Sequence, residues 1–156
     1  FIELFSSESC SSCPPADQWF SRLKSNPQLW KSFVPAVFHV DYWNHLDWKD
    51  DFSSREMTER QKAHANTWPV PRVYTPGVVL NGQEWTEWRS VASPPSNSSQ
   101  DVGVLAIEEA SEKYRVSFSP KGKLGGAVTF HLALLGMGMK NKITSGENSG
   151  SLLTHD

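Results

Sequence analysis

Apolar and polar positions along the first ninety residues fall into blocks typical of strands and helices in turn. Residues 1–5 are apolar at every position except Glu3, which is the pattern of a central strand covered on both faces. A second apolar run, residues 36–42, follows Pro35 and predicts another strand. Between these two runs, apolar side chains recur at helical spacing, at Ala16, Trp19, Phe20 and Leu23.

A second helix and a hairpin are predicted further along. Ser53 and Glu56 have the spacing of a capping box, so a helix is expected to begin there and to end before Pro69. Residues 78–80 then form a short β-type run, and Asn81-Gly82 is a two-residue hairpin turn that returns the chain antiparallel. The predicted order is therefore strand, helix, strand, helix, strand, strand.

The pattern changes after residue 89. Residues 90–101 are rich in Ser and Pro and have too little apolar content to pack, so they are predicted to be a linker or mobile loop. Beyond them, residues 102–109, 114–118 and 127–135 have β-type patterns. We predict that residues 102–156 form one antiparallel β module without a catalytic constellation, because His131 and His155 stand isolated in it.

Composition limits what the chain is expected to do. With 156 residues, 38% of them hydrophobic, it can bury one ordinary core, or one core and a small satellite. A formal charge of −2 with both signs interspersed excludes nucleic acid and anionic membranes as expected partners, because both need a basic face. The chain shown has no apolar run of 18 residues, so no membrane span is predicted in it.

Candidate chemistry concentrates at Cys10-Ser11-Ser12-Cys13, which contains the only two cysteines in the sequence. An apolar strand leads into this turn, and Pro14-Pro15 stand where a helix has its first turn, a place that tolerates proline. Unpaired amides and the dipole at a helix start stabilise a thiolate. The sequence therefore predicts thiol–disulfide exchange at a redox-active disulfide, with no metal and no other cofactor.

Three polar residues in the predicted strands are candidates for support of this site. A buried Glu3 would accept or relay a proton for the deeper thiol, whereas an exposed Glu3 would merely mark a frayed strand start. His39 and Asp41 are two apart and so fall on one face of the second strand, where they also are candidates for a proton relay. The structural alternative is that Asp41 caps the next loop and His39 is a core histidine with a hydrogen-bond partner.

The loop that follows, residues 42–51, combines large aromatic side chains with four charges. It comes after the carboxyl end of a strand, where open α/β sheets bind ligands. Trp43 and Trp48 are therefore candidates for an aromatic lip that grips a substrate. Alternatively, the same indoles are buried only to fix the loop in place.

The order of these features resembles the thioredoxin fold, an α/β three-layer sandwich in which a Cys-x-x-Cys turn faces a cis-proline loop. More narrowly, the strings at 3–5, 10–17, 38–43, 48–50, 60–61, 74–76 and 81–82 are similar to a largely uncharacterised family of bacterial thioredoxin-like proteins, many of them exported. The resemblance implies a thioredoxin-like domain at residues 1–89, followed by the β-rich extension. It also implies an exported protein, whose signal peptide would not be in the chain shown.

Residue by residue, the resemblance implies that Cys10 is the exposed nucleophile and Cys13 the resolving thiol. Pro76 would be the cis-proline, and Thr75 and Tyr74 before it would position the substrate backbone. The chain departs from the thioredoxins proper at Ser9, Ser11 and Ser12, which replace Trp, Gly and Pro of that motif.

Three hypotheses for function follow. The first is a thiol–disulfide oxidoreductase that acts on a protein or small-molecule thiol or disulfide. The second is a binding module in which Cys10–Cys13 is a static disulfide. The third is copper or zinc binding by Cys10 and Cys13 with one or two of His39, His45 and His64.

Overall fold

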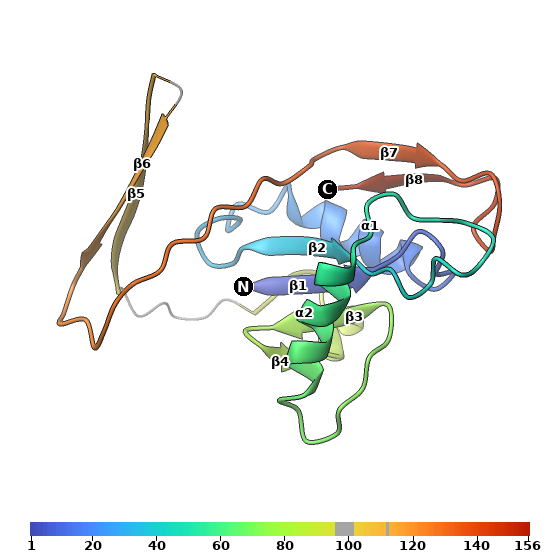
Figure 1. The fold of residues 1–156 in the computed structure, drawn as a ribbon, viewed down its shortest axis with the longest axis horizontal. Coiled ribbons are helices and arrows are strands. Elements are labelled where there is room, and N and C mark those ends of the chain that lie inside the picture. Colours follow the sequence, from blue (N-terminus) through green and yellow to red (C-terminus); the bar gives the residue numbers. More distant parts are fainter. Residues whose placement is uncertain (96–101, 112) are drawn as a thin grey trace. The chain divides into compact units, whose positions relative to one another are not determined.

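The computed structural model describes residues 1–95, 102–111 and 113–156 (Figure 1). The chain divides into two compact units, one made of Phe1–Ser96 with Leu135–Asp156 and the other of Asn97–Leu134. Both are built from short elements, and the whole is a mixed α/β protein. Among the described residues, no helix is long and apolar enough to cross a bilayer.

A four-stranded mixed sheet in the order β2-β1-β3-β4 forms the centre of the first unit. The central strand β1 runs parallel to β2 and antiparallel to β3, and β3 turns into β4 through Asn81 and Gly82, both with positive φ. These strands confirm the predicted β segments of the first ninety residues. Their bounds are β1 Ile2–Ser6, β2 Pro35–His39, β3 Gly77–Leu80 and β4 Gln83–Glu84.

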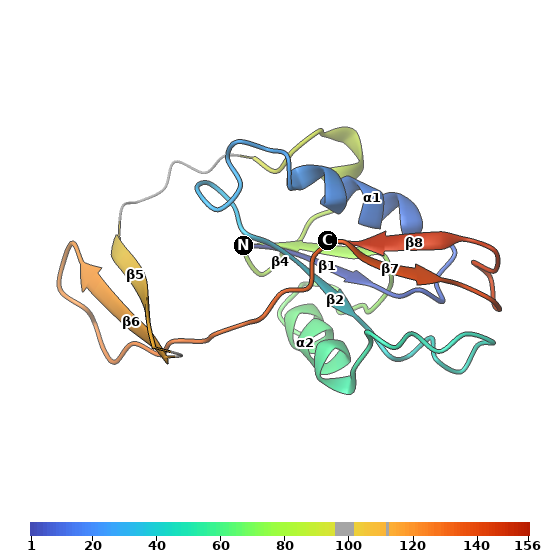
Figure 2. The same ribbon diagram turned by 90° about the horizontal axis from the view of Figure 1, so that it is seen from above.

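Two helices, α1 (Pro14–Leu23) and α2 (Arg55–Ala65), cover opposite faces of this sheet (Figure 2). Side chains alternate along β1, so Ile2 and Leu4 pack into the core on the α1 side while Phe5 packs into the core on the α2 side. A short 3-10 helix, Glu87–Ser90, adds Trp88 to the α1 side. Cys13 directly precedes α1, so the Cys10–Cys13 turn lies at the N-terminal end of this helix.

The start of α2 differs from the predicted capping box by one residue. Ser54, not Ser53, is the N-cap, and its hydroxyl accepts a hydrogen bond from the Met57 amide. Ser53 instead donates its hydroxyl to the Asp50 carbonyl and so closes the turn before the helix. The two adjacent serines offer the same side chain, and the loop geometry decides which of them caps the helix.

A hairpin from the C-terminal end of the chain belongs to the first unit. Strands β7 (Met139–Lys142) and β8 (Leu152–His155) pair antiparallel, and β8 packs against α1. The predicted single module 102–156 is therefore divided at residue 135. The β7–β8 hairpin belongs to the first unit because β8 packs against α1 and His155 contacts Glu8 in the turn before Cys10. No local sequence pattern predicts these contacts.

The second unit contains β5 (Gly103–Ala110) and β6 (Lys113–Pro120), paired antiparallel as predicted. The strand predicted at residues 127–135 is wrong: the segment is extended but pairs with no described strand, and Leu134 is 100% exposed. The predicted linker also starts later than residue 90, because the Val91 carbonyl accepts a hydrogen bond from Trp19 and Pro94 is buried. Its remaining residues 96–101 lie outside the described residues.

Candidate functional site

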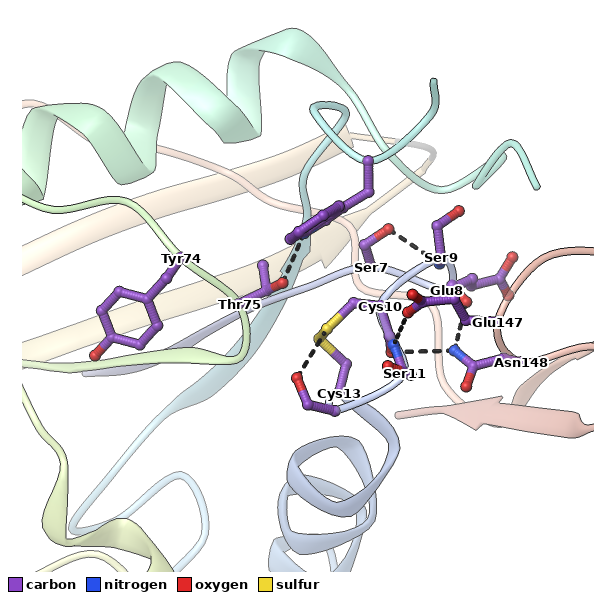
Figure 3. Close-up of a disulfide and its surroundings, with 12 residues drawn as sticks. Ser7, Glu8, Ser9, Cys10, Ser11, Cys13, Tyr74, Thr75, Glu147 and Asn148 are labelled. Atoms are coloured by element: carbon purple, nitrogen blue, oxygen red, sulfur yellow. Dashed lines mark hydrogen bonds between the residues drawn. A yellow bond between two sulfur atoms is a disulfide. The ribbon is translucent and has the colours of Figure 1, made fainter. Parts of the chain in front are cut away.

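Cys10 and Cys13 form a disulfide at the start of α1 (Figure 3). Cys13 is the N-cap of the helix, and its carbonyl accepts the amides of Ala16 and Asp17. Pro14 follows at the first helical position, where its missing N–H is not needed. Cys10 is 5% exposed and Cys13 is fully buried, so Cys10 is the more accessible of the two cysteines.

A buried carboxylate, Glu8, lies in the turn just before Cys10. Its Oε1 is 2.9 Å from His155 Nε2, and its Oε2 accepts hydrogen bonds from the indole of Trp48 at 2.9 Å and from Asn141 at 3.0 Å. Four partners from distant parts of the chain therefore fix this turn, since Asn148 also donates to the Glu8 carbonyl at 2.7 Å. These contacts add to the turn's own bonds, in which the Ser7 hydroxyl accepts the Ser9 amide and the Ser7 carbonyl accepts the Cys10 amide.

A second buried acid–base pair lies beside the first. Asp50 Oδ2 is 2.7 Å from His39 Nδ1 and also accepts the Glu8 amide. Burial by itself would lower the pKa of His39, but the hydrogen bond and the charge of Asp50 outweigh burial and raise it. Burial likewise opposes ionisation of Asp50, yet its bonds to His39 and two backbone amides hold the pKa of that carboxyl low. His39 is thus a paired core histidine, and its ring lies 4.7 Å from that of His155.

Asp17 is another buried carboxyl close to the cysteines in sequence, one helical turn after Cys13. Ser6 and His39 are register partners on the α1 face of the sheet and interact electrostatically with it. Burial raises the pKa of Asp17 to about 6, although Ser6 and His39 partly offset the effect of burial. Its Oδ1 has no hydrogen-bond partner among the described residues. Asp17 also lines a groove of about 420 Å³ between α1 and β8.

The loop before β3 lies on the side of the disulfide opposite Glu147 and Asn148, and Figure 3 shows Thr75 beside Cys10 and Cys13. The Thr75–Pro76 peptide bond is cis, as predicted. Trp43 donates its indole N–H to Thr75 Oγ1 at 2.7 Å, and Gln61 of α2 donates to the Tyr74 carbonyl at 2.7 Å. The structure therefore brings Thr75 to the cysteines, and the loop is held from both the aromatic loop and α2.

Three further residues of the predicted site are bound within the protein by their hydroxyl or indole groups. Tyr74 turns its hydroxyl to Glu84 at 2.6 Å, and burial together with that carboxylate raises the pKa of Tyr74 to about 12. Trp43 and Trp48 are half-buried, each with its N–H bonded inside the protein, so both indoles fix the 42–51 loop. This placement agrees with the structural interpretation of the two indoles.

Glu3 and Asp41 lie away from the cysteines. Glu3 is buried, contrary to the interpretation as an exposed strand start, and its carboxylate is bound on the α2 face by Arg60 at 2.6 Å and His64 at 3.1 Å. Asp41 does not share a face with His39, because β2 ends at His39 and the Asp41 carboxylate turns to the Thr58 hydroxyl on α2. Neither acid is placed to exchange a proton with Cys13.

The histidines considered as metal ligands are each held elsewhere. His39 binds Asp50, His45 is 2.8 Å from the Tyr42 carbonyl, and His64 binds Glu3. Across residues 1–95, 102–111 and 113–156, no three His, Cys, Asp or Glu side chains converge as metal ligands do. The copper or zinc hypothesis therefore has no ligand set in the described part of the chain.

Sequence patterns did not single out Glu8, Asp17, Asp50 or His155 as members of the site. Asp17 carried a usable signal, because a residue four positions after Cys13 shares its helix face. His155, predicted to be isolated, is instead 2.9 Å from Glu8. Its partner lies 147 positions away, a contact that only the tertiary fold makes.

The profile of a protein family of unknown function, DUF1223, matches residues 1–156. The chain belongs to the DUF1223 family. This DUF1223 protein is also similar to a crystal structure of a protein from Agrobacterium tumefaciens, with 37% sequence identity and a TM-score of 0.51. The similarity covers 58% of this chain and 40% of that chain. No curated protein matches the sequence.

Proposed function

We propose that this DUF1223 protein is a thiol–disulfide oxidoreductase with a thioredoxin-like domain at its N-terminal end. The sheet order β2-β1-β3-β4, with helices on both faces and a cis-proline loop beside the disulfide, supports the thioredoxin-like assignment. The observation that carries the function is a disulfide at a helix N-terminus, with Cys10 slightly exposed and Cys13 fully buried. One helical turn after Cys13 stands a buried carboxyl, Asp17, whose pKa is raised to about 6.

The reaction follows from this asymmetry. A substrate thiolate attacks Cys10 Sγ, the Sγ–Sγ bond breaks, and its electron pair leaves on Cys13. Protonated Asp17 gives its proton to the Cys13 thiolate, which would otherwise be a buried unpaired charge. A second substrate thiolate then attacks the substrate sulfur of the mixed disulfide and releases Cys10. Two electrons pass from the substrate dithiol to the protein, and the substrate leaves as a disulfide.

In the opposite direction the same groups reduce a substrate disulfide, with Asp17 as the proton acceptor for Cys13. The substrate class is a protein or small-molecule thiol or disulfide, held against Thr75. We further propose that the protein acts after export, in which case oxidation of substrate dithiols is the favoured direction in an oxidising compartment.

The low exposure of the two sulfurs favours one alternative, a binding module with a static disulfide. The two functions differ in reduction potential. Catalytic dithiols lie at about −120 to −270 mV, whereas structural disulfides lie below about −300 mV. Equilibration of the protein in glutathione buffers, followed by alkylation and mass measurement, gives this potential directly. We expect a value in the catalytic range, and a value below about −300 mV would establish the static alternative.

Single cysteine variants provide a second test of the proposed roles. Cys13→Ser leaves Cys10, the more accessible of the two cysteines, as the free thiol and should form a mixed disulfide with oxidised glutathione. Cys10→Ser leaves only the buried Cys13 and should react at least tenfold more slowly, because the sulfur is inaccessible. Equal rates of mixed-disulfide formation in the two variants would contradict the assignment of Cys10 as nucleophile.

A further inference from the structure

The loop between β7 and β8, residues 143–151, rests directly on the Cys10 turn. Asn148 is buried, and its amide donates to the carbonyls of Glu8 at 2.7 Å and Cys10 at 3.0 Å. Ser145 donates to the Asp47 carbonyl at 2.6 Å. A segment more than 130 residues away in sequence is therefore fastened over the first cysteine.

Gly146 shows how closely this loop fits. It has a φ of +73°, and a Cβ at this position would lie 3.1 Å from the Trp48 Cβ. A side chain here would meet both backbone strain and the Trp48 side chain. The position of the next residue, Glu147, is thus defined by contacts on both sides of it.

Glu147 brings a charge to the turn. Its Oε2 accepts the backbone N–H of Ser11 at 3.2 Å, and Figure 3 shows it beside Cys10 on the side away from Thr75. This amide lies just before the start of α1, where N–H groups would otherwise be open to a thiolate. The carboxylate occupies this donor and adds a negative charge at the residue that directly follows Cys10.

We propose that Glu147 is a positioning residue that lowers the reduction potential of the Cys10–Cys13 pair. This inference rests on the proposed function. Reduction adds two electrons and two protons and creates a Cys10 thiol that ionises to a thiolate. A neighbouring negative charge disfavours that thiolate, so it stabilises the disulfide relative to the reduced form. The β7–β8 loop thereby sets how strongly the protein oxidises its substrates.

The test compares Glu147→Gln with wild-type protein in glutathione buffers at a pH where Cys10 is ionised in both. The glutamine keeps an oxygen that accepts the Ser11 amide but removes the charge. One nearby charge typically shifts a pKa by about one unit at the low end, so we expect up to about a tenfold shift toward the reduced protein. A tenfold shift equals about 30 mV toward a more positive potential. The pKa of Cys10, followed by thiolate absorbance, should fall in parallel.

Glu59→Gln is the matched control, because it removes the same charge from an exposed position on α2. Its potential should equal that of the wild type. The difference made by Glu147→Gln should also shrink in 1 M salt, since exposed charges are then screened within about 3 Å. A loss of loop packing alone would not show this salt dependence.

The outcomes separate the two proposals. A reducible pair whose potential and Cys10 pKa are the same in Glu147→Gln and wild type would overturn the role of Glu147 and leave the oxidoreductase intact. A pair that resists reduction in all variants would overturn the proposed function, and the role of Glu147 with it.

Discussion

Replacement of Asp17 by asparagine is expected to stabilise the oxidised protein by about 3 kcal/mol at pH 8 and by almost nothing at pH 3. The folded-state pKa of about 6 exceeds the ordinary value of 3.8, and each pKa unit corresponds to about 1.4 kcal/mol. The folded chain therefore binds a proton more tightly than the unfolded chain. The free energy of unfolding of the wild type therefore falls as the pH rises from about 4 to 6. Above pH 6 it stays lower by the full cost of ionising the buried Asp17.

Urea unfolding of wild type and Asp17→Asn between pH 3 and pH 8 measures this difference. Asp51→Asn is the control, because Asp51 is an exposed aspartate in the same unit and its replacement should change stability by less than about 0.5 kcal/mol. A stability difference for Asp17→Asn that is equal at pH 3 and pH 8 would show that burial does not perturb this carboxyl.

The same variant tests the proposed proton transfer. Without the carboxyl, release of Cys13 loses its proton donor, and exchange should slow by about 10²-fold, the lower end of what general acids contribute. The rate at which a reagent of fixed thiolate concentration reduces the wild-type disulfide should fall as the pH rises through about 6, because Asp17 then loses its proton. A variant that is more stable yet slower separates the chemical role of Asp17 from a structural one.

Replacement of His155 by leucine is expected to destabilise the protein by about 3–5 kcal/mol. The change removes the partner 2.9 Å from Glu8 Oε1 and leaves a carboxylate whose side chain is fully buried, and an unpaired buried charge carries a cost of this size. Trp48 and Asn141 still bind the other oxygen, Oε2, so the turn before Cys10 loses part of its support rather than all of it.

Denaturant unfolding of four proteins measures this coupling: wild type, His155→Leu, Glu8→Gln and the double variant. His155→Leu should cost less in the Glu8→Gln background, because no charge is then left unpaired. Lys24→Met removes a half-exposed ammonium from Asp156, near the end of the same hairpin. Asp156 keeps its bond to the Gly138 amide, so the change should cost only about 0–1 kcal/mol. If His155→Leu costs no more than Lys24→Met, the Glu8–His155 pair contributes nothing to stability.

The sequence by itself determined the elements of the first ninety residues and the place of the chemistry. Strand β1, the helix that begins after Cys13, and the Asn81-Gly82 turn follow from apolar spacing and local residue preferences, which act over a few residues. Cys10, Cys13 and the Thr75–Pro76 bond were identified in the same way or through the family resemblance. Local rules also led to errors, at Ser53 and at the unpaired segment 127–135.

Only the tertiary structure decided which polar groups surround the disulfide. Glu8 meets His155 across 147 positions, and Ser11 meets Glu147 across 136, through a hairpin that the pattern assigned to another module. The role of Asp17 likewise depends on how deeply α1 buries it, because the same aspartate on an exposed face would titrate near 3.8. Burial and long-range pairing arise from packing, and a one-dimensional pattern of polar and apolar residues does not contain them.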